Sequence, residues 1–154
     1  MIDAKKIARD FPILHRKIDG KRLVYLDSTA TSLKPHAVLD AMDAYYTQYG
    51  ANVFRGIYKI SEKATEAYEG ARARIAGFIG ASHASEVVYT RSSDESISLV
   101  YYSWVLTHCK PGDEIVTTII EHHANFVPWQ QVSLHHGVTL KIWYVNRDGQ
   151  LNLN

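Results

Sequence analysis

The residues best suited to chemistry in this sequence are a glutamate and two histidines that follow an apolar run. Residues 115–120 are all β-branched, which is typical of a buried strand, and Glu121, His122 and His123 come directly after them. Open α/β sheets bind their ligands at the carboxyl ends of their strands. An imidazole there can stack on a flat ring, ligate a metal or transfer protons. The sequence therefore predicts a site at this strand end, with these three chemistries open.

A metal is the least favoured of the three. Adjacent residues of an extended chain point to opposite faces, so His122 and His123 would not readily bind one ion. Neither the second pair, His135 and His136, nor the single Cys109 lies at a ligand spacing from them. A further interpretation stays open, in which the pair is a surface or capping feature without a ligand. Cys109 itself is expected to be a partly buried structural cysteine.

The turn of residues 90–95 is the second segment that could bind a ligand. Small hydroxyl residues there lead from a predicted strand into a predicted helix, whose first N–H groups and dipole attract anions. The alternative is that Ser92 and Glu95, three residues apart, form a capping box that needs no ligand. Asp94 in the first turn suits the helix dipole and would repel a phosphate. The residue types favour the capping interpretation.

Strands and helices must position these segments, and the hydrophobic pattern predicts that they alternate. Helices are expected before Pro12 and over residues 35–49, 62–79, 93–106 and 127–135, and strands over residues 23–26, 87–89, 115–120 and 138–145. Ser61 is expected as a helix cap, Pro128 in a first helical turn, and Gly80 and Gly137 as helix stops. The fold class is therefore α/β, one domain over residues 1–154 with a mostly parallel sheet. The sheet has only three or four strands, fewer than the usual number.

Composition excludes several classes of function. Seventeen basic and sixteen acidic residues give a net charge of +1, so no general attraction to nucleic acid or membranes follows. The single cysteine excludes an internal disulfide framework, and there is no signal peptide or membrane-spanning run, which predicts a cytoplasmic protein. A chain of 154 residues should bury roughly 70% of its unfolded surface.

Five motifs, taken in order and spacing, resemble the N-terminal part of group II cysteine desulfurases. The motifs are YLDSTATSLKP (residues 25–35), ANVFRGIY (51–58), YEGARARIAGFIGA (68–81), VVYTRSSDESISLV (87–100) and EHHANFVPWQ (121–130). This group comprises the SUF-type desulfurases and selenocysteine lyases of the class V aminotransferase family. The match runs over essentially all 154 residues and covers less than half of a family member.

The resemblance implies a pyridoxal phosphate (PLP) enzyme of fold type I, usually a homodimer. This chain would be the N-terminal half of the large domain and would be incomplete. The family removes sulfur from cysteine as an enzyme persulfide and leaves alanine, with PLP as the electron sink. The resemblance places the cofactor against His122, which stacks on the pyridine ring, and against Ser93 and Asp94 at the phosphate; it places Thr29, Ala30 and Arg55 on the substrate side.

The chain also departs from the family pattern. Ser92, Ser93 and Asp94 stand where the family has Gly-Thr-Thr, and Phe54 and Tyr58 replace both histidines of His-Arg-Gly-Ile-His. The family's Schiff-base lysine, pyridine-nitrogen aspartate, persulfide cysteine and substrate-binding arginine lie beyond the part that this chain matches. The resemblance therefore assigns no catalytic residue here.

Three functional hypotheses follow from the resemblance. The first is a truncated desulfurase-like chain that is inactive alone and does not bind PLP by itself. The second is one half of a split desulfurase that a second chain completes. The third is a non-enzymatic interaction module of the iron–sulfur and sulfur-transfer system. The expected partners are further copies of the chain, a complementary or full-length desulfurase chain, or a sulfur-acceptor protein, because part of a sheet should expose apolar surface.

Overall fold

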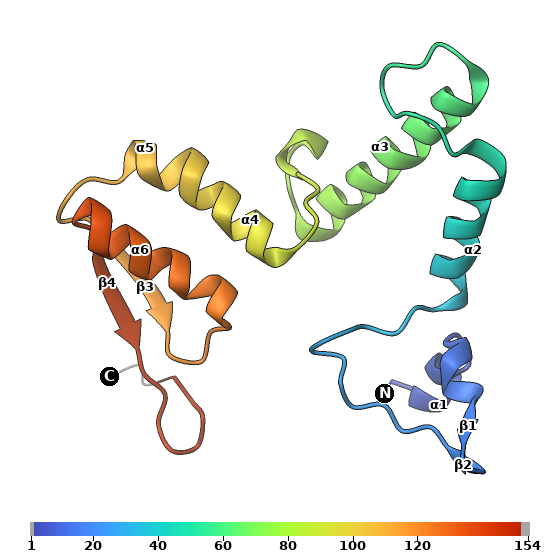
Figure 1. The fold of residues 1–154 in the computed structure, drawn as a ribbon, viewed down its shortest axis with the longest axis horizontal. Helices are drawn as coiled ribbons and strands as arrows, with labels where there is room; N and C mark the ends of the chain where they lie inside the picture. The colour runs from blue at the N-terminus through green and yellow to red at the C-terminus, as the bar shows by residue number, and fades with distance from the viewer. Residues whose placement is uncertain (1, 152–154) are drawn as a thin grey trace. The chain divides into compact units, whose positions relative to one another are not determined.

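The computed structural model describes residues 2–151, which form two compact units (Figure 1). The N-terminal unit ends at Val87 and the C-terminal unit begins at Val88. Each unit has its own elements and is described by itself. Within residues 2–151, no helix combines the length and the apolar character that a membrane crossing requires.

The N-terminal unit begins with short elements. Helix α1 (Ala4–Ala8) is capped by the Asp3 carboxylate, which accepts from the Lys5 and Lys6 amides, and is followed by a 3₁₀ turn, η1 (Pro12–His15). Strands β1 (Lys17–Ile18) and β2 (Lys21–Arg22) then form an antiparallel hairpin. Its turn residues, Asp19 and Gly20, both have positive φ, as a tight two-residue hairpin loop requires.

Two longer helices complete this unit. Helix α2 (His36–Ala44) continues into a π-helical turn, η2 (Tyr45–Tyr49), so the helix expected over residues 35–49 is present. Helix α3 (Lys59–Ile79) ends at Gly80 in the left-handed region, as the sequence predicts, and a 3₁₀ turn, η3 (Ala84–Glu86), follows. The expected cap at Ser61 is wrong. The helix begins at Lys59, two residues before Ser61, so Ser61 lies inside the first turn and is fully buried.

The C-terminal unit is a βαβ arrangement beside a helix of mixed geometry. The helix consists of α4 (Ser93–Val100), the π-helical η4 (Tyr101–Val105) and α5 (Leu106–His108). Strand β3 (Glu114–Thr118), the 3₁₀ turn η5 (His123–Asn125), helix α6 (Val127–His136) and strand β4 (Thr139–Trp143) follow, with Pro128 in the first turn of α6. Strands β3 and β4 pair in parallel, from Glu114 opposite Thr139 to Thr118 opposite Trp143.

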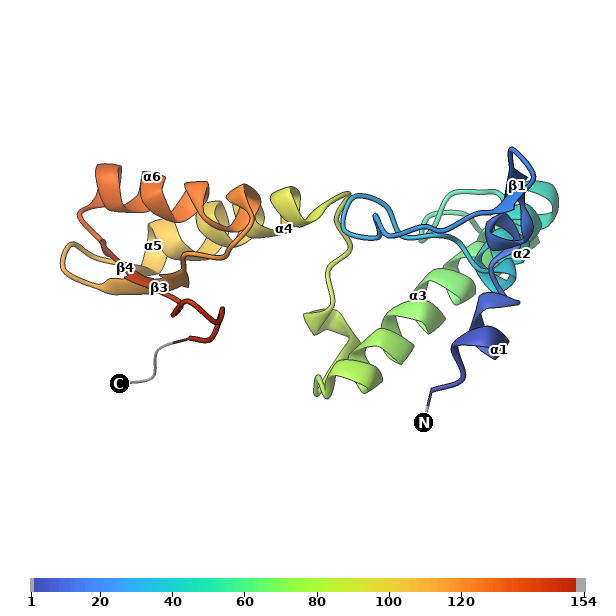
Figure 2. The ribbon, with the colours of Figure 1, turned by 90° about the horizontal axis from the view of Figure 1, so that it is seen from below.

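The core of the C-terminal unit lies between the helices and one face of this strand pair. Val105, Val132 and Val138 are buried together, and Tyr101, Cys109, Ile115 and Trp129 pack against them. Burial alternates along both strands, which is typical of a sheet with one covered face. Figure 2 shows α6 running over the β3–β4 pair.

The expected strands at residues 23–26 and 87–89 are wrong. Both segments lack strand pairing, and the parallel sheet among residues 2–151 has two strands rather than three or four. A strand needs a neighbour to complete its backbone hydrogen bonds along its length. The Leu23 amide donates to the Arg16 carbonyl, but within the described residues neither segment is paired as a strand. The α/β class and the parallel pairing are confirmed.

The expected burial is also wrong, because the chain exposes 12556 Å². Two separate compact units of half the chain's mass each would together expose only about 9,500 Å². The chain buries about half, not 70%, of the roughly 25,000 Å² of its unfolded state. Large apolar side chains contribute to this exposed area, among them Val24, Leu26, Ile57, Phe78, Val88, Val116, Ile120, Leu134 and Tyr144.

The small core of the C-terminal unit makes Val132 a sensitive position. Val132 is 0% exposed, so Val132→Ala should lower the free energy of unfolding of this unit by about 1–3 kcal/mol, because it leaves a cavity. All three tryptophans belong to this unit, so urea unfolding followed by tryptophan fluorescence reports on it.

The matched control is Val88→Ala, the same chemical change at a side chain that is 64% exposed and outside any helix or strand. It should change the free energy of unfolding by less than about 0.5 kcal/mol. Equal urea midpoints for the two variants would contradict the assigned core.

Candidate functional site

The segment after β3 is fixed by a row of polar side chains. The Glu121 carboxylate accepts from the Thr118 hydroxyl at 3.1 Å and from the Asn125 amide at 2.9 Å. The Asn125 oxygen in turn accepts from the Trp129 indole N–H at 3.0 Å. All four side chains are half-buried. This Glu121–Asn125–Trp129 network ties the carboxyl end of β3 to the first turn of α6.

Both histidines lie at the carboxyl end of β3, where the sequence places them. His122 caps η5, because its Nδ1 accepts from the Ala124 amide at 3.2 Å. The His123 ring lies 6.4 Å away and perpendicular to it, and both side chains are exposed. His122 thus has the local role of a capping residue, and its exposed ring can still be reached by a flat ligand. Among residues 2–151, no group of three or more His, Cys, Asp or Glu side chains could hold a metal.

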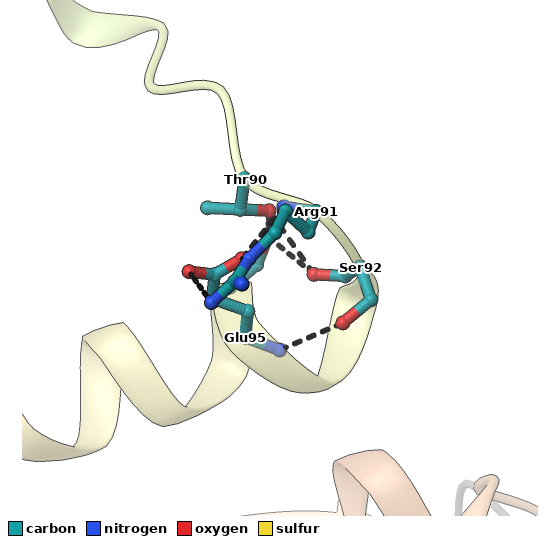
Figure 3. Close-up of polar contacts among 5 residues, drawn as sticks. Thr90, Arg91, Ser92 and Glu95 are labelled. Carbon is teal, nitrogen blue, oxygen red and sulfur yellow. Dashed lines mark hydrogen bonds and ion pairs between the residues drawn. The ribbon is translucent and has the colours of Figure 1, made fainter.

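The turn at the start of α4 is closed by its own side chains (Figure 3). The Ser92 hydroxyl accepts from the Glu95 amide at 3.2 Å, which confirms Ser92 as the cap. The Glu95 carboxylate reaches back and accepts from the Arg91 amide at 2.7 Å. In a standard capping box the Glu95 carboxylate would accept from the amide of Ser92 itself, whereas here it accepts from the amide one residue earlier.

The charges at this turn also balance one another. The Arg91 guanidinium, 3.2 Å from Glu95, and the Arg91 amide together hold the pKa of the Glu95 carboxyl below its usual value. Asp94 adds a second carboxylate in the first turn. The positive end of the helix dipole is therefore met by two carboxylates of the same turn.

These residues do not fit the phosphate that the resemblance implies. A phosphate at a helix start needs free backbone N–H groups and no competing negative charge. Here the Arg91 and Glu95 amides already have acceptors, and Asp94 would repel an anion. Ser93 and Asp94 are present at the expected place, but the turn is built as a cap.

The expected site residues divide between the two units. Ser93 and Asp94 open α4, which packs against η5, so they lie on elements next to the one that His122 caps. Thr29, Ala30 and Arg55 belong to the N-terminal unit, where all three are exposed. Thr29 and Ala30 lie in a turn in which the Ala30 amide donates to the Asp27 carbonyl.

The segment that holds Arg55 is folded onto the start of α3. Phe54 has a φ of 74°, which is strained for a bulky residue, and its amide donates to the Thr65 hydroxyl at 3.0 Å. Its ring packs edge-on against Tyr68. Gly56 is required, because a Cβ there would lie 2.1 Å from the Ser61 hydroxyl oxygen. The contact between the Phe54 and Tyr68 rings indicates that Phe54 serves packing at its position.

Sequence reasoning singled out the histidines and missed the role of the residues that position them. Glu121, Asn125 and Trp129 are spaced four apart, and their side chains are joined in that order. A carboxylate, an amide and an indole at this four-residue spacing are the sequence feature from which the network could have been predicted.

Comparison with known proteins gives one family. Residues 24–154 match the aminotransferase class-V family. A probable cysteine desulfurase of Synechocystis sp. is 50% identical over 147 residues, which are 96% of this chain and 34% of that protein. The chain spans about a third of the length of the curated relatives it matches.

Two solved structures are also similar. The apo cysteine desulfurase of Thermococcus onnurineus NA1 matches with a TM-score of 0.85 and 38% identity, over 99% of this chain and 36% of that one. The cysteine desulfurase CsdA of Escherichia coli matches with a TM-score of 0.75 and 35% identity, over 96% of this chain and 36% of that one.

Asn125→Ala should disconnect Trp129 from Glu121. Both would lose a half-buried partner, so the C-terminal unit should be destabilised by about 1 kcal/mol, and the Trp129 indole proton should shift and exchange faster with solvent. NMR of the three indole N–H signals measures this, with Trp104 and Trp143 as internal references. The neighbouring exposed substitution Gln130→Ala is the control. An unmoved Trp129 signal in Asn125→Ala would exclude the network.

Arg91→Ala should raise the pKa of Glu95 toward its usual value of 4.5, because the guanidinium bond is lost while the amide bond remains. A carboxyl whose pKa is lowered by folding stabilises the folded state above pH 4.5 and loses this contribution as the pH falls through the lowered value. NMR titration of the Glu95 carboxyl tests this. The control is Arg74→Ala, an exposed arginine on α3. An identical Glu95 titration in the wild type and Arg91→Ala would refute the pairing.

Proposed function

The chain belongs to the aminotransferase class-V family, and from this membership we propose that it is a cysteine-desulfurase-type chain that does not desulfurate cysteine by itself. The reaction of such enzymes needs a lysine that forms a Schiff base with PLP and a cysteine that accepts sulfur. No lysine of these 154 residues lies in a motif that matches the family's Schiff-base lysine.

The environment of Cys109 carries this proposal. It is the single cysteine of the sequence, and it is half-buried against the cluster of Val105, Val132 and Val138. A sulfur-accepting thiol must reach the substrate and then present its persulfide to a second protein. A thiol that is half-buried against this cluster is poorly placed for both tasks. Its surroundings are those of a structural cysteine.

A second candidate function is association with another polypeptide that supplies the missing groups or takes up sulfur. The observation that favours it is the uncovered face of the β3–β4 pair. Val116 on that face is exposed, and Ile120 and Tyr144 just beyond the two strand ends are exposed as well. Parallel strands are normally covered on both faces. A complementary or full-length desulfurase chain, or a second copy of this chain, would cover such a surface.

The purified chain with added PLP and cysteine should release no sulfide and should not develop the visible absorbance of a lysine Schiff base in stoichiometric amount. The Synechocystis relative, assayed in parallel, is the positive control. Mixing the chain with the part of that relative that lies beyond its match tests the second candidate. Sulfide release only after mixing would establish the second, and sulfide release by the chain alone would sink the first.

A further inference from the structure

We infer that the amino end of α4 is a closed cap, so that this chain supplies no phosphate contact at that turn even within an assembled enzyme. The inference rests on the family membership in the proposed function and goes beyond it, because it concerns an assembly with a partner as well as the chain alone. The phosphate of a pyridoxal cofactor would then have to be held by groups that this turn does not provide.

The backbone donors are the first reason. A phosphate at a helix start is held by N–H groups of the preceding turn and of the first helical turn. The Arg91 amide donates to Glu95 at 2.7 Å, and the Glu95 amide donates to Ser92 at 3.2 Å. An incoming anion would have to break both bonds before it could accept from these two amides. The amides of Ser93 and Asp94 also lie in this first turn, where an anion would meet the Asp94 carboxylate.

The hydroxyl groups are the second reason. The Thr90 and Ser96 hydroxyl oxygens lie 2.6 Å apart and 3.0 and 3.2 Å from the Ser92 carbonyl oxygen. One hydroxyl donates to this carbonyl and the other donates to the first hydroxyl, so both protons are used within the turn. The Ser92 hydroxyl is occupied as the cap. The polar groups of Thr90, Ser92, Glu95 and Ser96 thus hydrogen-bond to one another, as Figure 3 shows for the labelled residues. The hydroxyl that remains is that of Ser93, which is exposed next to the Asp94 carboxylate.

Charge is the third reason. Asp94 and Glu95 both lie in the first turn of α4, and Arg91 is engaged with Glu95. A phosphate placed over the first turn would meet the Asp94 charge without a free cation of the turn to offset it. The charge of Asp94 therefore adds to the effect of the occupied donors.

The test uses ¹⁵N-labelled chain titrated with inorganic phosphate and with pyridoxine 5′-phosphate, which has no aldehyde and cannot react with surface lysines. The readout is the NMR shift of the Ser93, Asp94 and Glu95 amides. The wild-type chain should show no saturable shift. The triple variant Ser92→Gly, Ser93→Thr, Asp94→Thr should show one, because it frees the Glu95 amide and removes the Asp94 charge.

A milder variant guards against loss of the fold. Asp94→Asn keeps the Ser92 cap and should make the initial slope of amide shift against phosphate concentration about fivefold steeper than in the wild type. This is the factor expected from removing one charge about 4 Å away in water. Glu62→Gln removes a carboxylate from the first turn of α3 and should leave the α4 amides unchanged.

Two outcomes would overturn the inference. Saturable wild-type shifts at Ser93 to Glu95 would show that the turn is open to phosphate. Absence of binding in both α4 variants would show that Ser92 and Asp94 are not what closes it. Neither outcome bears on the proposed function, which the sulfide assay tests separately.

Discussion

The parallel pairing of β3 with β4, closed over Val132, is the constraint on which the C-terminal unit depends. The register ends with Thr118 opposite Trp143, which places Thr118 at the carboxyl end of the pair. Thr118 holds Glu121, and the row of bonds from Glu121 through Asn125 ends at Trp129. The Trp129 side chain packs back against the core around Val132. The site segment is therefore fixed at both ends by the same small core.

The small size of this core also accounts for the apolar surface that the unit leaves exposed. Three buried valines and one covered sheet face are little apolar packing for a unit of this size, and much apolar surface stays exposed. The similar solved structures and curated relatives are about three times as long as the part matched here. The elements of this chain correspond to one region of those proteins. Its uncovered sheet face and its occupied α4 turn support the proposal that the chain does not form a cofactor site by itself.

Local signals in the sequence predicted the elements whose cause is local. Gly80 and Gly137 end their helices in the left-handed region, Pro128 opens α6, and Ser92 caps α4, each for a reason visible within a few residues. The residues expected to form strands at 23–26 and 87–89 have the right composition. Pairing depends on a distant neighbour, however, which composition does not reveal. Ser61 resembled a cap by type, but its hydroxyl donates instead to the Asn52 carbonyl in the preceding loop.

The site was predictable to a similar extent. The place of His122 and His123 followed from the strand before them, and the capping role of Ser92 followed from its spacing to Glu95. The bond between the Glu95 carboxylate and the Arg91 amide and the network behind His122 could not be predicted from the sequence, because each depends on which rotamer a side chain adopts.

The most direct test of this account is calorimetric titration of the wild-type chain with pyridoxine 5′-phosphate. We expect no heat beyond that of dilution, because the α4 turn is closed and His122 alone supplies only a stacking face. Saturable heat that disappears in His122→Ala would contradict it, since the chain would then hold the cofactor without a partner.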